Sequence, residues 1–543
     1  MNLTTLPTEL IIHTCDYLEV ADWCAVRLTC KTLFLRTWEA FADSNFQTVC
    51  VLITSQSLSR LAAVAADENL RTRVRNLWIV PTLFEGSLEK NHGLPRNEMR
   101  PLRENCFAAS CYAEGSWSDT ELSNRFTAYQ SIVADHCHVL STGTFASTIR
   151  ELLACFNNLD GIGLRSCPTR LLLDSTQPAN FPCFGVRQLR QQLPCRSATA
   201  SPAYLWQEKK RMGDRHASVF SAVVSAIISE QRKLQRLETC DDHHCGVAAQ
   251  ELTILRTETT TPEYKRFLAL LQNLESLHLC LSGTNKSFTY CYKEDCLRNA
   301  VEMVAAAPSL RTLTLSPCYN PGERLPTQVF SQLAPRVHFT RLTELDLHGV
   351  DTTHGDLQAF LRSAATTLQR LTLSSVNLVE PITPASPCHP EPHSAEKHQW
   401  ILDCRAEIVR RWRAVWVSLH DEMASLRYLC MRDLLFHGHR VEVSDPACTL
   451  SGTAPQTLPL RCRQTRTSAQ RCPASPVVFE ADNAQITLSE WIRQLKVDPA
   501  QRMSKLMFQR ILPAALAAGG AALAVNSFWL DSLFPAGGSG WME

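Results

Sequence analysis

The chain of 543 residues lacks a charge excess of either sign, because its 54 basic and 53 acidic residues leave a net charge of +1. Binding to nucleic acid or to an anionic membrane through overall charge would need a strong basic excess. The sequence also lacks a phosphate-binding glycine loop, a zinc helix with paired histidines and a serine nucleophile elbow. We therefore expect no nucleic-acid partner, no catalytic residues and no cofactor.

The 23 cysteines lack the dense, regular spacing of a disulfide scaffold, so we expect reduced thiols packed as small apolar residues. Zinc sites usually gather their ligands as two spaced pairs. Two groups come nearest to this pattern: "CDDHHC" at Cys240–Cys245, and the set Cys388, His389, His393, His398 and Cys404. The first has adjacent histidines and the second has no paired spacing. We interpret both as polar loops without a metal.

The N-terminus lacks the pattern of a secretory signal, since Glu9, His13 and Asp16 interrupt its apolar residues. This predicts a cytoplasmic or nuclear protein. One uncharged segment, Ile511–Leu530, is about long enough to cross a bilayer. It is rich in alanine and contains helix-breaking residues, so a loosely ordered or docked tail is favoured over a membrane anchor, and no membrane partner is expected.

Apolar residues are instead concentrated at the start of the chain, in "LPTELIIHTCDYLEVADWCAVRLTCKTLF" from Leu6 to Phe34. Pro7 and Glu9 suit the first turn of a helix. The apolar spacing predicts a second helix from about Val20 and a third from about Lys31. So short a bundle buries little surface by itself, and we expect some of its leucines to contact another protein.

This stretch resembles an F-box, in the form common among fungal proteins, over about residues 4–46. The residues that carry the resemblance are Leu6, Pro7, Glu9, Leu10, Leu18, Leu28, Cys30, Lys31 and Leu33. Thr14 departs from it, because the family usually has a branched aliphatic residue there. The resemblance implies docking on the adaptor subunit of an SCF-type ubiquitin ligase, and through that adaptor on a cullin.

The resemblance implies a set of adaptor-binding residues, which are Leu6, Pro7, Leu10, Ile11, Leu18, Leu28, Cys30, Lys31 and Leu33. Apolar side chains of this set would contribute about 25 cal/mol for each Å² removed from water. The alternative is that they only close the core of the bundle itself.

After residue 46 the sequence repeats one kind of phrase. The clear copies are "NLESLHL" at Asn273, "SLRTLTL" at Ser309, "RLTELDL" at Arg341, "TLQRLTL" at Thr367 and "SLRYLCM" at Ser425. Weaker copies begin at Val74, Asn158 and Leu234. The last two apolar positions of each phrase have the period of a strand, and amphipathic helical runs precede most of the clear copies.

These phrases resemble a degenerate leucine-rich-repeat region. The predicted fold is α/β, with a short N-terminal three-helix F-box followed by an irregular leucine-rich-repeat-like solenoid. An unrelated α/β domain with similar strands is the alternative. The expected divisions are 1–46 for the F-box, 47–500 for the array and 501–543 for the apolar tail, with loop inserts near 191–216, 381–398 and 444–476.

Side chains that alternate with the buried leucines would line one face of the predicted sheet. The residues expected to contact a substrate there are His278, Thr314, Asp346, Thr372 and Tyr428. This mixed polar set suits a protein ligand better than a nucleic acid. The sequence thus predicts a non-catalytic substrate-recognition subunit of a ubiquitin ligase. The alternative is an interaction scaffold that works without a ligase.

Overall fold

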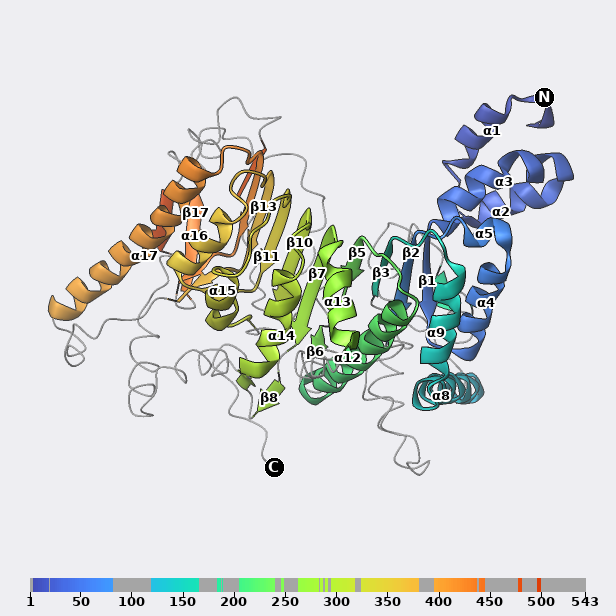
Figure 1. The fold of residues 1–543 in the computed structure, drawn as a ribbon, viewed down its shortest axis with the longest axis horizontal. Helices are drawn as coiled ribbons and strands as arrows, with labels where there is room; N and C mark the ends of the chain where they lie inside the picture. The colour runs from blue at the N-terminus through green and yellow to red at the C-terminus, as the bar shows by residue number, and fades with distance from the viewer. Residues whose placement is uncertain are drawn as a thin grey trace. The chain divides into compact units, whose positions relative to one another are not determined.

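A computed structural model describes the chain in two units, Met1–Asn285 and Lys286–Glu543. The described residues are 3–18, 20–81, 119–165, 183–186, 188, 205–239, 246–248, 262–282, 284–286, 289–291, 294–317, 324–379, 395–436, 439–444, 477–480 and 496–499. Each unit combines helices with a mostly parallel sheet, so the predicted mixed α/β class is confirmed (Figure 1). The division falls inside the region expected to be one array.

The chain begins with a short 3-10 turn, η1 (Leu3–Thr5), and three helices. These are α1 (Thr8–Cys15), α2 (Val20–Thr29) and α3 (Lys31–Phe46). Their number and bounds agree with the prediction from apolar spacing. Pro7 precedes the first residue of α1, and Cys30 caps α3.

The sheet of the first unit follows the order β7-β5-β3-β2-β1-β4, with β6 also paired to β7. Its strands are β1 (Thr48–Leu52), β2 (Asn76–Val80), β3 (Gly161–Leu164), β4 (Cys183–Phe184), β5 (Arg236–Glu238), β6 (Val247–Ala248) and β7 (Ser276–Ser282). The helices of this unit beyond the first three are α4 (Ser55–Ala66), α5 (Glu68–Arg71), α8 (Asp119–Ser141), α9 (Thr144–Cys155), α12 (Leu205–Ser229) and α13 (Pro262–Gln272).

The second unit has a sheet in the order β18-β15-β13-β11-β10, and a smaller sheet in the order β12-β14-β16-β17-β19. The strands are β10 (Thr312–Pro317), β11 (Glu344–His348), β12 (Asp351–Thr352), β13 (Arg370–Ser374), β14 (Asn377–Leu378), β15 (Tyr428–Arg432), β16 (Leu435–Phe436), β17 (His439–Ser444), β18 (Val477–Glu480) and β19 (Lys496–Pro499). The helices are α14 (Glu294–Ala305), α15 (Thr327–Leu333), α16 (His354–Arg362) and α17 (Ala395–Glu422). Two further short strands are β8 (Thr284–Lys286) and β9 (Thr289–Cys291).

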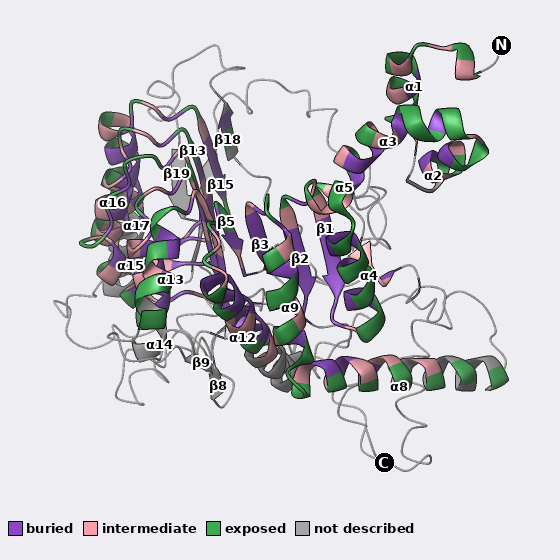
Figure 2. Cartoon of the chain, turned by 45° about the vertical axis from the view of Figure 1, so that its right-hand side comes forward, coloured by how far each residue is buried: buried purple, intermediate pink, exposed green. Residues whose placement is uncertain are grey.

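All eight repeated phrases, clear and weak, form strands that pair in parallel within their units. The apolar residues of each phrase are buried, as Leu277, Leu313 and Leu371 illustrate (Figure 2). The helical runs that precede the phrases at Ser309, Thr367 and Ser425 form α14, α16 and α17. The alternation of helix and parallel strand is therefore confirmed.

A common backbone junction precedes these strands. The carbonyl of Gln369, for example, accepts N–H bonds from both Arg427 (2.8 Å) and Tyr428 (2.9 Å) on the next strand. The same doubled bond recurs at Gln47, Arg75, Asp160 and Gln235 in the first unit, and at Arg311 and Thr343 in the second. The same backbone hydrogen-bond pattern therefore recurs before the strands of both units.

The expected loop inserts fit only in part. The prediction of a loop over 191–216 is wrong for the second half of that stretch, because α12 begins at Leu205. Residues 207–212 read "QEKKRM", and each of these residue types favours a helix even where no apolar period is visible. The helix α17 likewise begins inside the insert 381–398, at Ala395. The remainder of these two inserts, residues 445–476 and the tail 501–543 lie outside the described residues.

Candidate functional site

The three N-terminal helices close a small core of their own. Its buried members are Ile11, Cys15, Trp23, Leu33 and Phe41. The rings of Trp23 and Phe41 meet edge to face with their centroids 5.7 Å apart. The partly buried Leu6, Leu18 and Cys30 pack against this core. The bundle therefore buries one set of apolar residues without any partner.

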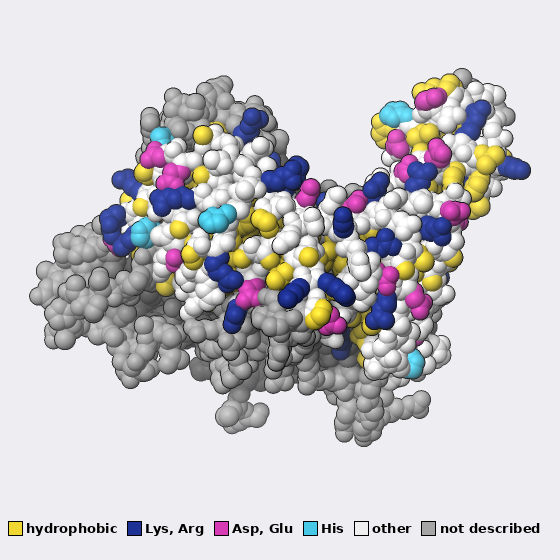
Figure 3. Space-filling view, in the orientation of Figure 1, with side chains coloured by type: hydrophobic (Ala, Val, Ile, Leu, Met, Phe, Trp, Pro, Cys, Tyr) yellow, Lys and Arg dark blue, Asp and Glu magenta, His cyan; other side chains and the backbone are white. Residues whose placement is uncertain are grey.

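A second set of apolar residues remains on the surface of the same helices (Figure 3). Leu28 is 84% exposed and Leu10 is 51% exposed, although leucine is normally among the more buried residue types. Pro7 and Lys31, two other residues of the expected adaptor-binding set, are also exposed. These four residues are accessible to a partner.

Ile11 and Leu33 do not have the surface position that a contact residue needs. Ile11 lies one helical turn before the buried Cys15, and Leu33 lies one turn before the buried Thr37. Both side chains face the core of the bundle. These two residues therefore close the core of the bundle, as the alternative supposes, and their contact with the adaptor stays a prediction.

Polar contacts fix the start of the bundle. Arg36 of α3 donates hydrogen bonds from Nη1 to the carbonyls of Thr4 (3.1 Å) and Leu6 (2.9 Å). The hydroxyl of Thr14, the position that departs from the family pattern, donates to the carbonyl of Leu10 within α1 (2.7 Å). Because Thr14 is exposed, this departure from the F-box-like pattern lies on the surface of the bundle and outside its core.

Arg27 is a distinctive residue of the bundle that sequence reasoning missed. Its guanidinium carbon lies 4.8 Å from the ring centroid of Phe34, 5.0 Å from that of Trp38 and 3.8 Å from that of Phe41. Its burial lowers the pKa of Arg27 from the usual arginine value. The available signal was an arginine within the apolar α2, followed by aromatic residues at helical spacing on α3.

Three residues of the expected substrate face lie side by side in the second unit. Thr314 on β10 opposes Asp346 on β11, and Asp346 opposes Thr372 on β13. All three are half-buried. The parallel register thus brings together residues that are 58 positions apart in the sequence, from 314 to 372.

Tyr428 belongs to a neighbouring row of this face. Its register partner on β13 is Arg370, whose guanidinium carbon lies 4.2 Å from the centroid of the Tyr428 ring. The residue of β15 that opposes Thr372 is Cys430, which is buried. Burial raises the pKa of the Cys430 thiol, so this cysteine is a poor nucleophile.

His278, the fifth expected residue, lies in the first unit on β7. It is half-buried and opposes Glu238 on β5. Glu238 forms an ion pair with Arg165 (3.0 Å), and the guanidinium of Arg165 stacks over Trp78 with 4.1 Å to the ring centroid. The surroundings of His278 are therefore charged and aromatic.

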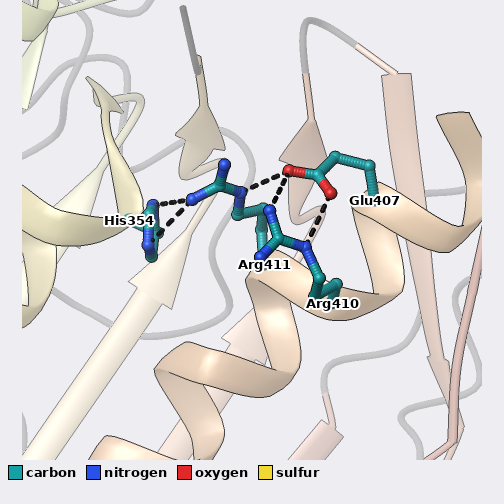
Figure 4. A network of polar contacts seen from close by, with 4 residues as sticks. All are labelled: His354, Glu407, Arg410 and Arg411. Atoms are coloured by element: carbon teal, nitrogen blue, oxygen red, sulfur yellow. Dashed lines mark hydrogen bonds and ion pairs between the residues drawn. The ribbon is translucent and has the colours of Figure 1, made fainter.

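The second unit also holds a compact polar network between α16 and α17 (Figure 4). Glu407 accepts hydrogen bonds from Arg410 (2.6 and 2.7 Å) and from Nε of Arg411 (2.5 Å). Nη1 of Arg411 lies 3.1 and 3.0 Å from the two ring nitrogens of His354. The arginines lower the pKa of Glu407 to about 2, which makes this carboxylate a weak base. The network links α16 to α17.

Within the described part of the chain, no group of three or more His, Cys, Asp or Glu side chains could hold a metal ion. The group at Cys240–Cys245 lies outside the described residues, as does most of the group around Cys388. The described helices include none that is long and apolar enough to span a membrane. The segment Ile511–Leu530 also lies outside the described residues.

Comparison with known protein families finds no family model that matches this chain, and comparison with curated proteins finds no match either.

Proposed function

We propose that this protein is a substrate-recognition subunit of an SCF-type ubiquitin ligase. In this proposal, α1–α3 dock on the adaptor subunit and the parallel sheets bind a protein substrate. The chain itself performs no chemistry. It raises the concentration of the substrate near the ubiquitin carrier that other subunits hold.

The observation that carries the proposal is the division of apolar residues in the N-terminal helices. A complete core is closed by Ile11, Trp23, Leu33 and others, and yet Leu28 and Leu10 remain exposed at positions of the F-box-like pattern. Full burial of one leucine contributes about 1.5–3 kcal/mol. A few such residues at the centre of an ordinary interface could therefore supply much of the affinity.

The test is the double variant Leu10→Asp with Leu28→Asp in the full-length chain. Both side chains point to solvent, so the bundle is expected to fold, but two buried carboxylates at the interface would abolish adaptor binding. A pull-down with the recombinant SCF adaptor measures this. The matched control is Val417→Asp, since Val417 is an apolar residue of α17 that is 56% exposed. Unchanged adaptor recovery by the double variant would overturn the proposal.

A second readout separates the ligase from a scaffold that uses the adaptor alone. Immunopurified full-length protein is expected to bring down a cullin together with the adaptor. Recovery of the adaptor without a cullin would instead favour the scaffold function.

A further inference from the structure

Arg27 is a buried cation without an anionic partner among the described residues. Its side chain is 8% exposed, and no acidic side chain of the described residues forms an ion pair with it. The three aromatic rings of α3 surround the guanidinium and take the place of water on its faces. Its Nε is buried and lacks an acceptor, as does Nε1 of Trp23 one helical turn earlier.

The outer end of the same guanidinium remains available. Among the described residues, the buried nitrogens that lack an acceptor include Nε of Arg27 but neither of its terminal nitrogens. Since those two nitrogens make no hydrogen bond within the described chain either, they must keep contact with solvent. They are also held in one orientation by the rings, so a carboxylate could bind both of them at little entropic cost.

The surface around Arg27 is apolar and positively charged. Leu28 follows it directly, and α3 presents Lys31, Phe34 and Leu35 on one exposed face, since these residues are three and four positions apart. A partner that covered Leu28 and Phe34 would also cover the terminal nitrogens of Arg27. Unless that partner supplied an acceptor, it would bury a charge without compensation.

We infer that Arg27 is the ion-pairing residue of the docking surface, and that it receives a carboxylate from an acidic segment of the adaptor beside the contacts of Leu28 and Phe34. This inference rests on the proposed function and adds to it the charge chemistry of the interface. The aromatic rings preorganise the guanidinium, and Lys31 adds a second positive charge to the attraction.

The experiment measures the affinity of the full-length chain for the recombinant adaptor by calorimetry, at low and at high salt. Arg27→Met keeps the length and apolar packing of the side chain but removes its charge. We expect binding about 10- to 100-fold weaker at low salt, with a smaller dependence on salt than in the unchanged protein. The affinity of Arg27→Lys should lie between that of Arg27→Met and that of the unchanged protein, because lysine keeps the charge but cannot form the two-point hydrogen bonds of a guanidinium.

The control is Arg60→Met, which removes an exposed charge on α4, outside the three N-terminal helices, and should leave the affinity unchanged. If Arg27→Met does not fold, the salt dependence of Arg27→Lys decides in its place. Unchanged affinity and salt dependence in Arg27→Met, together with loss of binding by the Leu10 and Leu28 double variant, would overturn this inference alone. Failure of the unchanged chain to bind the adaptor would overturn both.

Discussion

At the scale of single residues, several charged side chains of the second unit link α16 to α17. Glu407 joins Arg410 and Arg411 on α17, and Arg411 reaches His354 on α16 (Figure 4). Arg362 of α16 forms a two-point ion pair with Glu422 of α17, at 2.6 and 2.9 Å. These links are partly exposed, so each contributes only a modest stability.

Glu407→Gln should reveal the pH dependence of this network. The pKa of Glu407 is lowered to about 2 by its arginine partners, so its contribution is present above the unfolded pKa near 4.5 and is lost as pH falls toward 2. We expect the variant to be less stable by about 0.5–1 kcal/mol at neutral pH. Thermal unfolding between pH 6 and pH 3 should show this difference shrinking.

Glu344→Gln is the comparison for that measurement, since Glu344 is exposed on β11 and forms no ion pair with a described residue. The difference in stability between Glu344→Gln and the unchanged protein should stay nearly constant over the same pH range. If the difference in stability between Glu407→Gln and the unchanged protein were also constant with pH, the stabilising role of Glu407 and its arginine partners would be contradicted.

The sequence predicted the N-terminal helices well but could not separate their exposed apolar residues from those of their core. Leu10 and Ile11 are adjacent aliphatic residues on α1, and the structure exposes the first and buries the second. Helical periodicity places them on different faces without saying which face meets α2 and α3. That choice depends on long-range packing, which also explains why the ring contacts of Arg27 were missed.

At the scale of elements, the close approach of neighbouring strands constrains side-chain size. A Cβ atom added at Gly163 on β3 would lie 2.6 Å from the Trp78 ring and 2.7 Å from the carbonyl oxygen of Glu238. The weak phrase at Asn158 therefore carries glycine where the neighbouring strands leave no room. The Trp78 ring in turn supports the guanidinium of Arg165.

Gly163→Ala should destabilise the first unit by about 1–3 kcal/mol, because the backbone carbonyl cannot move aside easily. Gly355→Ala is the matched control. Gly355 lies in α16, and its added Cβ would come no closer than 3.9 Å to Thr353. That variant should be stabilised by up to about 1 kcal/mol through helix propensity. Thermal unfolding of both variants checks the pair, and equal effects would contradict the steric account.

The elements that the sequence predicted are those with a strong local signal. Each repeated phrase alternates apolar and polar residues over a strand, so β7, β10, β11, β13 and β15 were all found. The second sheet was missed, because β12, β14 and β16 have two residues each and no period to detect. Ser375 and Asp433, which precede β14 and β16, have positive φ angles. The residue types serine and aspartate do not by themselves predict this backbone conformation.

At the scale of the whole molecule, both units repeat the same junction before their strands, which supports the proposal of a leucine-rich-repeat-like array. Within the first unit, α3 is linked to the segment that leads into β2 by an ion pair between Asp43 and Arg73 (2.5 Å). Deleting residues 1–46 would therefore remove contacts of the first sheet as well as the docking helices. Point variants in the intact chain test the two binding functions more cleanly.

Thr372→Arg tests the proposed substrate face in this way. Thr372 lies between Asp346 and Cys430 in register, so a long charged side chain there would stand over the centre of the face in the second unit. In proximity labelling with the full-length chain, the labelling of specific protein neighbours should then fall severalfold while the adaptor is labelled as before.

Ser331→Arg on α15 is the control, because it adds the same side chain at an exposed helical position. The Leu10 and Leu28 double variant should give the reverse pattern, with the adaptor lost and the other neighbours kept. Identical neighbours for Thr372→Arg and Ser331→Arg would show that the substrate binds elsewhere on the chain.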